Sequence, residues 1–360
     1  MPESILPPKR KRVRKKVGHR CGYVGIAGRP NAGKSTLLNA MVGAKIAIVA
    51  AKPQTTRTAI QGVLNIPERA QVIFVDTPGI HESSTPLNRR MMQTVRASLD
   101  GRDLILYVVD ASLPLDEEER HAIDAVRKTG VPTVLVVNKI DRIGDKAKML
   151  PLLQQYGEAF PFVDIVPVSA RKGDGLPELK AIVLKRLPVA PALYPEDHLT
   201  DQPLRFMAAE FIREQILHHT HQEVPHAVAV VVDKWEEEPR CVKIHATIFV
   251  ERDGQKKIVI GEKGQLLKTV GTRARRVIEE WTGRPVFLEL FVKVREHWRE
   301  SADFLNELDW RTVASSREGK DASDTTDNAK AAGDSGPSDH GGDHGGGPGG
   351  SGSGKKGAKP

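Results

Sequence analysis

Cysteine is scarce in this chain, and long apolar runs are absent from it. Only Cys21 and Cys241 occur among 360 residues, too few for the disulfide framework that stabilises many small secreted proteins. No run approaches the ~18 apolar residues of a membrane-spanning helix. No apolar segment typical of a secretory leader precedes residue 21. We therefore expect a soluble cytoplasmic protein, long enough for about two domains plus tails.

Positive charge is concentrated at the start of the chain. The formal net charge is +8, and the first 20 residues hold eight Lys or Arg against a single acid, Glu3. We expect residues 1–20 to form a disordered basic arm that contacts RNA phosphates. Residues 8–12 also resemble a nuclear localisation signal, which we consider the weaker alternative. Residues 313–360, rich in Gly, Ser and Asp, are expected to form a disordered tail.

The first motif that carries chemistry is a phosphate-binding loop of the Walker A type. It follows an apolar stretch, 23–27, that predicts a strand, and precedes a predicted helix at 35–41. Glycines let such a loop curl so that its N–H groups and the helix N-terminus face the phosphates. Lys34 is expected to reach the β- and γ-phosphates, and Ser35 to ligate Mg²⁺. The nucleotide-binding candidates of this segment are Gly28, Arg29, Pro30, Asn31, Ala32, Gly33, Lys34, Ser35 and Thr36.

Two further segments supply groups for the metal and the γ-phosphate. The apolar run 72–75 delivers Asp76 to the carboxyl end of a buried strand, where its carboxylate can hold the Mg²⁺ shell. Thr56, in the polar segment 54–57, is predicted to close its hydroxyl on the metal when triphosphate binds. Ser35, Thr56 and Asp76 are therefore the candidate metal ligands. The nucleotide-binding candidates of the second segment are Asp76, Thr77, Pro78 and Gly79, the last with its N–H toward the γ-phosphate.

Two motifs that follow apolar runs predict selection of guanine. In the motif 138–141, the Asp141 carboxylate can accept from the N1–H and N2–H₂ of guanine, a donor pair that adenine lacks. At 169–170, a backbone N–H can donate to guanine O6. Either motif alone is common by chance, but all five motifs in this order predict a GTP site. The candidates are Asn138, Lys139, Asp141, Ser169 and Ala170.

Strand and helix patterns alternate from residue 21 to residue 188, including an apolar run at 104–109 and an amphipathic helix at 117–128. This alternation predicts an α/β domain with a mostly parallel sheet and helices on both faces. The phosphate loop is then expected at the carboxyl ends of the strands. Prolines interrupt the pattern and place a linker at 189–203.

Residues 204–312 are predicted to form a second, α+β domain that binds RNA. The pattern gives a helix at 204–219, a turn at Asp253-Gly254, a basic helix to about Trp281, and strands at 227–235, 242–250 and 286–294. A strand or short apolar turn at 257–260 feeds a Gly-x-x-Gly loop, which is typical of the K homology RNA-binding module.

Basic residues around this loop favour RNA binding over a merely solvated charged face. We expect Lys263, Lys268, Arg273, Arg275 and Arg276 on one helix. Glu262 places an acid in the loop, which should weaken its affinity for phosphate unless the side chain points away. The RNA-binding candidates are Gly261, Glu262, Lys263, Gly264, Lys268, Arg273 and Arg276.

On these residues, the chain from Cys21 to about Trp310 resembles the Era-type GTPases, which are bacterial ribosome-assembly factors. Beyond the nucleotide motifs, the strings at 194–197, 200–201, 205–206 and 251–261 carry the resemblance. It implies an α/β P-loop GTPase domain at 21–188 and a type II K homology domain at 204–312. It also implies Mg²⁺-dependent hydrolysis of GTP to GDP, binding near the 3′ end of 16S ribosomal RNA, and a role in 30S subunit assembly and rRNA processing. A monomer that makes peripheral contact with the inner face of the cell membrane is a further expectation.

Intrinsic hydrolysis is expected to be slow. Ile80 follows the motif 76–79, where small signalling GTPases carry a glutamine that orients the attacking water. The resemblance links Asn31 to potassium, since its side-chain oxygen could help hold K⁺ beside the phosphates. The alternative is that Asn31 only stabilises the turn. The catalytic candidates are Lys34, Thr56, Gly79 and Asn31.

Two other functions remain open from the sequence. One is an RNA-binding scaffold with a weak nucleotide switch, although the residues of a working site are all present. The other is a tRNA-modifying or membrane-associated GTPase with a similar first domain. The strings in the second domain argue against that alternative.

Overall fold

The computed structural model describes residues 18–80, 85–145, 147 and 149–309. The predicted tail lies outside the described residues, and so does the predicted arm up to residue 17. The first sheet is built from β1 (Arg20–Ala27), β2 (Ile60–Ile66), β3 (Ala70–Asp76), β4 (Leu104–Asp110), β5 (Thr133–Asn138) and β6 (Asp164–Pro167). Its helices are α1 (Lys34–Val42), α2 (Pro86–Leu99), α3 (Glu117–Arg127), α4 (Met149–Ala159) and α5 (Leu176–Arg186).

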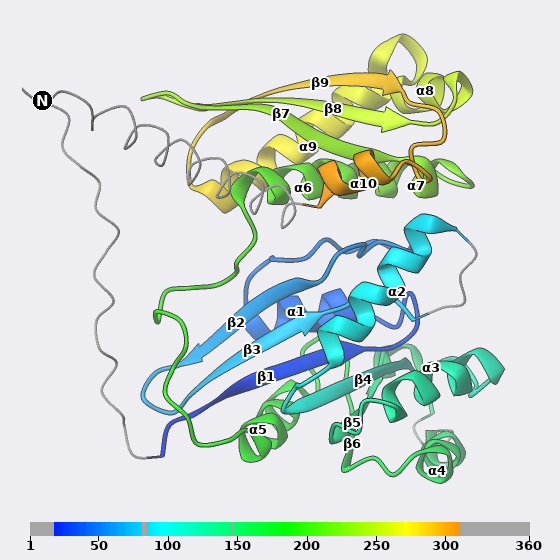
Figure 1. Cartoon of the computed structure of the whole chain (residues 1–360), viewed down its shortest axis with the longest axis vertical. Helices are drawn as coiled ribbons and strands as arrows, with labels where there is room; N and C mark the ends of the chain where they lie inside the picture. The colour runs from blue at the N-terminus through cyan, green and yellow to red at the C-terminus, as the bar shows by residue number, and fades with distance from the viewer. Residues whose placement is uncertain (1–17, 81–84, 146, 148, 310–360) are drawn as a thin grey trace, which may run out of the picture. The chain divides into compact units, whose positions relative to one another are not determined.

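The strand order of this sheet is β2-β3-β1-β4-β5-β6, and all neighbours except β2 and β3 are parallel. Every residue of β3 is buried, because a parallel strand covered on both faces has no solvent side. Side chains of α1 and α5 pack on one face, and those of α2, α3 and α4 on the other. The prediction of a mostly parallel, doubly covered sheet is confirmed (Figure 1).

The segment after α5 packs along the outer edge of the first sheet. Gln71 of β3 accepts hydrogen bonds from the backbone N–H groups of Leu193 and Tyr194, at 2.7 and 2.9 Å. Thr200 donates to the carbonyl of Gln61 in β2 at 2.7 Å. The predicted linker is therefore held against the sheet by side-chain bonds.

The second sheet has the order β7-β8-β9. β7 (Ala229–Glu237) pairs with β8 (Val242–Val250) in antiparallel orientation, and β8 pairs with β9 (Val286–Val294) in parallel. Helices α6 (Leu204–His219), α8 (Asp253–Ile260) and α9 (Gln265–Thr282) pack with it around one apolar core. Two short helices, α7 (Val224–Ala227) and α10 (Ala302–Leu308), complete the described part.

The structure corrects the predicted turn at Asp253-Gly254 and the strand or turn at 257–260. These residues form the helix α8, with Asp253 in its first turn. Gln255 at the third helical position accepts from the N–H of Arg252 at 3.2 Å, which fixes the start of the helix. The run Ile258-Val259-Ile260 suggested extended backbone because β-branched residues favour strands. Burial of Val259 in the core selects the helix instead.

Apolar side chains also join α2 to α10 and to the segment just before it. Leu87 and Met91 of α2 share a buried cluster with Trp298, Phe304 and Leu305. The Trp298 indole donates to the carbonyl of Ala227 at 2.9 Å, which satisfies its N–H inside the cluster.

Among the described residues, no helix is both long and apolar enough to cross a membrane.

Candidate functional site

The predicted phosphate loop connects β1 to α1 at the carboxyl end of the sheet. Gly28 and Gly33 have φ values of 142° and 97°, and a Cβ on either would lie 2.2 Å from a neighbouring atom. Only glycine fits both conditions. Lys34 is buried and donates to the carbonyls of Gly28 and Arg29, at 2.9 and 2.8 Å. Burial lowers the pKa of the Lys34 ammonium to about 8.

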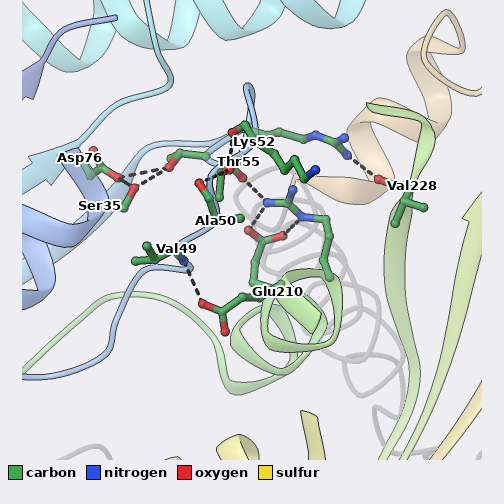
Figure 2. Close-up of polar contacts among 12 residues, drawn as sticks. Ser35, Val49, Ala50, Lys52, Thr55, Asp76, Glu210 and Val228 are labelled. Atoms are coloured by element: carbon green, nitrogen blue, oxygen red, sulfur yellow. Dashed lines mark hydrogen bonds and ion pairs between the residues drawn. The ribbon is translucent and has the colours of Figure 1, made fainter. Parts of the chain in front are cut away.

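The three predicted metal ligands meet at one point, and Figure 2 labels two of them, Ser35 and Asp76. The Ser35 hydroxyl lies 2.7 Å from Asp76 Oδ2 and 2.8 Å from the Thr56 hydroxyl, which is 3.3 Å from the same carboxylate oxygen. The other oxygen, Asp76 Oδ1, is buried without a hydrogen-bond partner among the described residues. Burial raises the pKa of Asp76 to about 6, although Lys34 and the two hydroxyls lower it. Oxygen ligands with an unsatisfied carboxylate fit Mg²⁺, a hard cation.

The segment after Asp76 packs closely against the phosphate loop. The Thr77 hydroxyl donates to the carbonyl of Ile26 at 2.9 Å, and the Ile80 N–H donates to that of Gly28 at 3.1 Å. A Cβ on Gly79 would lie 2.6 Å from the backbone nitrogen of Pro30. The absence of a side chain at Gly79 thus lets this segment reach the loop.

The predicted base-binding residues share a network of side-chain bonds. Asn138 donates from Nδ2 to the carbonyl of Ala32 at 2.9 Å. Ser169 donates to Asp141 Oδ1 at 2.7 Å, which lowers the pKa of this carboxyl and orients it. Lys139 donates to the carbonyl of Asn31 and to Asp110, both at 2.6 Å. Asp110 was not among the predicted site residues, although its position at the end of an apolar strand could have identified it.

The backbone N–H groups at 169–170, predicted as donors to guanine O6, already have acceptors within the protein. Ala170 donates to Asn138 Oδ1 at 3.0 Å, and Ser169 donates to the carbonyl of Asp174 at 2.9 Å. The first bond holds the loop against the end of β5, and the second closes the loop on itself. The Ala170 N–H can reach guanine O6 only by sharing its hydrogen between two acceptors.

These residues surround a cavity of about 740 Å³, which lies in the size range of small-molecule sites. Gly28, Arg29, Ala32, Asp76, Thr77, Pro78 and Ser169 support the cavity without lining it. The predicted residues that line it are Pro30, Asn31, Gly33, Lys34, Ser35, Thr36, Thr56, Gly79, Asn138, Lys139, Asp141 and Ala170.

Residues of α6 that the sequence analysis missed hold the loop that carries Thr56. Glu214 accepts from the Val49 N–H at 2.9 Å and from Lys45 at 2.6 Å, and Arg213 donates to the carbonyl of Thr55. His218 of the same helix lines the large cavity. These side chains lie more than 150 residues from the loop, so no local pattern connects them to it.

Arg29 makes a second set of contacts that the sequence did not reveal. Its guanidinium donates to Asp116 at 2.7 and 2.8 Å and to Glu118. Asp116 caps α3 by accepting from the Glu119 N–H at 2.8 Å. The phosphate loop is therefore tied to the start of α3.

The predicted RNA-binding loop lies between α8 and α9. Gly261 has φ 74°, and a Cβ there would lie 2.7 Å from the Leu266 side chain. Glu262 and Lys263 are exposed. Lys263 belongs to a short 3₁₀ turn and not to the basic helix, because its φ of 48° breaks the helix there. Lys268, Arg273, Arg275 and Arg276 lie on α9 and are exposed.

Known proteins of similar sequence show which family this chain belongs to. Residues 23–139 match a family model described as 50S ribosome-binding GTPase, and residues 223–299 match the KH domain. A GTPase Era from Nitratidesulfovibrio vulgaris is 48% identical over 301 residues, which are 81% of this chain and 98% of the relative. The chain belongs to the Era family of GTPases.

Two more members support this assignment. Over 80% of this chain and 97% of the relative, GTPase Era from Geobacter metallireducens is 47% identical. A crystal structure of Era in complex with MgGDPNP and nucleotides 1506–1542 of 16S ribosomal RNA matches with a TM-score of 0.78 and 41% identity. That match covers 80% of this chain and 98% of the solved chain. The predicted family and fold are confirmed.

The raised pKa of the buried Asp76 carboxyl predicts how the stability of this Era-family protein depends on pH. Since its pKa is raised to about 6 from 3.8, folding takes up a proton at Asp76, and metal-free stability rises as pH falls through this range. Asp76→Asn should therefore stabilise the metal- and nucleotide-free protein at pH 7, on the order of 2 kcal/mol. The gain should shrink as the pH falls below 6, and added Mg²⁺ should stabilise only the parent.

Thermal unfolding in EDTA between pH 4 and pH 8 measures this effect. Asp124→Asn, at an exposed carboxylate on α3, serves as the matched control and should change little. A pH-independent difference between Asp76→Asn and the parent would contradict the assignment.

Proposed function

We propose that this GTPase binds Mg·GTP in the 740 Å³ cavity and hydrolyses it there. The observation that supports this best is the meeting of Ser35, Thr56 and Asp76 beside Lys34. Mg²⁺, when bound, would neutralise charge on the β- and γ-phosphates. Ser35 and Thr56 would each turn a hydroxyl oxygen toward it, and Asp76 would supply the negative charge.

Lys34 is the group that would change partners on nucleotide binding. Its ammonium bonds to two carbonyls of its own loop, and phosphate oxygens would offer stronger, charge-assisted acceptors. A negatively charged partner would also raise the lowered pKa of this lysine. Gly79 would present its N–H to the γ-phosphate from its position against Pro30.

We propose Asp141 as the residue that selects guanine. Ser169 occupies one oxygen of the carboxylate and fixes its orientation. The carboxylate lines the cavity, where it can accept from the two neighbouring donors of the guanine edge. Lys139, held by Asp110, would flank the base.

Potassium is proposed as an activating ion at Asn31. This residue is exposed at the cavity with φ 63°, a conformation that asparagine tolerates. Its side chain has no hydrogen bond within the described part of the chain, so its oxygen can serve a cation. Ile80 is buried and apolar, and a cation would compensate for the missing water-orienting glutamine.

The second domain is proposed to bind small-subunit ribosomal RNA near its 3′ end, in 30S assembly and rRNA processing. The solved Era relative was crystallised with that part of 16S rRNA. The exposed loop 261–264 and the basic side chains of α9 form the surface that would contact it. Glycine lets the loop approach the RNA backbone closely. We propose the domain boundaries 21–188 and 204–312 for the two activities.

Monomeric state, cytoplasmic location and peripheral contact with the inner membrane stay predictions. The scaffold alternative is disfavoured because the candidate metal-binding and base-binding residues are all present and contact one another. The alternative of a tRNA-modifying or membrane-associated GTPase is disfavoured by family membership over 98% of an Era relative.

Asp141→Asn should move specificity from GTP toward xanthosine triphosphate, because the amide offers a donor where xanthine presents a carbonyl. Affinity for GTP should fall about 100-fold, as expected for two lost charge-assisted hydrogen bonds. Titration with both labelled nucleotides measures the exchange of preference. Asp145→Asn, at a nearby exposed carboxylate, is the control; unchanged preference in Asp141→Asn would remove this residue from the base site.

Turnover should be faster in potassium chloride than in sodium chloride at equal ionic strength. Asn31→Gly should erase this difference, because glycine accepts the same φ but has no side-chain oxygen. Asn31→Asp, which keeps an oxygen, should retain it. Phosphate release under single-turnover conditions gives the rates. Equal rates of the parent in both salts would leave Asn31 as a turn residue.

Lys263→Asp should weaken binding of RNA from the 3′ end of the small subunit by about tenfold, because it sets two acids against the phosphates. Intrinsic GTP turnover should not change. Lys128→Asp, at an exposed site in the first domain, is the matched control. Deletion of residues 1–17 should instead weaken the binding of all RNAs to the same extent, and it should make the RNA affinity less dependent on salt concentration. If the deletion alone abolished discrimination between this RNA and other RNAs, the second domain would not be the part that recognises the RNA sequence.

A further inference from the structure

Asp110 is a sheltered carboxylate at the nucleotide cavity that none of the five sequence motifs contains. Its side chain is 9% exposed, and the residue lines the cavity. It is the last residue of β4 and pairs with Asn138, the last residue of β5, in the parallel register. Parallel strands end at the same edge of a sheet, so Lys139, which follows Asn138, begins beside Asp110. The sheet itself therefore sets the position of this carboxylate.

The two oxygens of Asp110 have different partners. Oδ1 accepts from the Ser112 N–H at 3.0 Å and from the Ser112 hydroxyl at 2.6 Å, which closes the turn after β4. Oδ2 accepts from the Lys139 ammonium at 2.6 Å. Burial acts to raise the pKa of Asp110, but the bonds from Lys139 and Ser112 bring this pKa below its ordinary value. The carboxylate is therefore charged at neutral pH and forms an ion pair with Lys139.

Lys139 extends this contact to the phosphate loop. The same ammonium donates to the carbonyl of Asn31 at 2.6 Å. Asn31 has φ 63° and Lys139 has φ 65°. Such a conformation costs free energy in residues other than glycine, and it persists only where surrounding contacts fix it. The ammonium thus joins two strained positions, one in the phosphate loop and one in the base-binding segment.

A second ion pair connects the phosphate loop to the segment after β4, but it is more exposed. Arg29 lies 2.7 Å from Asp116, whose side chain is 46% exposed, and it also pairs with Glu118. Water and salt screen exposed ion pairs, which therefore contribute little to stability. The sheltered pair of Asp110 and Lys139 is screened less, and no second carboxylate of the described residues bonds to Lys139.

We propose that Asp110 is a positioning residue for guanine-nucleotide binding, which slows nucleotide dissociation by holding Lys139 on the Asn31 carbonyl. This role rests on the proposed binding of guanine nucleotides in the cavity. Asp110 acts through Lys139, and loss of the pair would add a route of release in which the phosphate loop and the base-binding segment separate. The candidate metal ligands form a cluster of their own, so the rate at which bound GTP is hydrolysed should not change.

Asp110→Asn tests the pair in the full-length protein. The amide oxygen can still accept from Ser112, whereas the amide NH₂ presents a second donor to the Lys139 ammonium. Dissociation of fluorescently labelled GDP and GDPNP is followed after addition of excess unlabelled GDP. Both rates should rise by about tenfold, as expected for a lost bond between charged groups, while single-turnover hydrolysis of GTP should stay within about twofold.

A double-mutant cycle with Lys139→Met separates positioning from a merely structural role. If Asp110 acts through Lys139, addition of Asp110→Asn to the Lys139→Met protein should change dissociation by less than about twofold. A structural role would leave the full effect in that background, and it would lower the unfolding temperature of the nucleotide-free protein. Additive effects in the cycle would therefore overturn the proposal.

Asp116→Asn is the matched control, because it makes the same change of charge at the other end of the segment. Asparagine can still cap α3, and Arg29 keeps Glu118, so dissociation should stay within about twofold of the parent. A parental dissociation rate in Asp110→Asn, or equal effects of the two substitutions, would overturn the role of Asp110 alone. A parent that binds no guanine nucleotide would overturn the proposed function as well.

Discussion

The buried carboxylate of Asp76 is the constraint on which the rest of the site depends. The sheet places this group at the end of a fully buried strand, where one oxygen accepts two hydroxyls and the other has no described partner. The Lys34 ammonium donates its hydrogen bonds to two carbonyls of its own loop. The fold therefore holds an under-neutralised charge that a divalent cation can complete. Folding buries this charge at a cost in free energy, and a bound cation would offset that cost.

The loop that carries Thr56 depends on both domains. Its partners Glu214 and Arg213 lie on α6, and Arg57 reaches the end of α7. Thr56 itself contacts the sheet domain. The position of the Thr56 hydroxyl beside Ser35 and Asp76 therefore depends on contacts with the first sheet and with α6 and α7. Any rearrangement of the loop would break contacts on both sides, which makes it suited to two discrete arrangements rather than a continuous range.

Local spacing predicted part of this architecture, and long-range contacts decided the rest. Ser35, Asp76 and Asp141 could be placed because each lies in a short motif at the end of an apolar strand pattern or at the start of the helix after the glycine-rich loop. The helix 253–260 was misread because Ile258 and Ile260 are β-branched and Asp253-Gly254 is typical of turns. The bond of Ala170 to Asn138 joins backbone to a side chain 32 residues away. Glu214 carries no motif, and it acquires its role only through packing of α6.

Asn138, the last residue of β5, joins two loops with one amide. Its nitrogen holds Ala32 of the phosphate loop, and its oxygen holds Ala170 beside the predicted base site. The phosphate and base ends of the cavity are thus joined to each other through the end of β5. Separation of those ends would break both hydrogen bonds. The dissociation rate of a bound nucleotide would be governed by the opposite wall, the segment 48–56 that lines the cavity. The kinetics of nucleotide exchange in this family member would accordingly report on the opening of that segment.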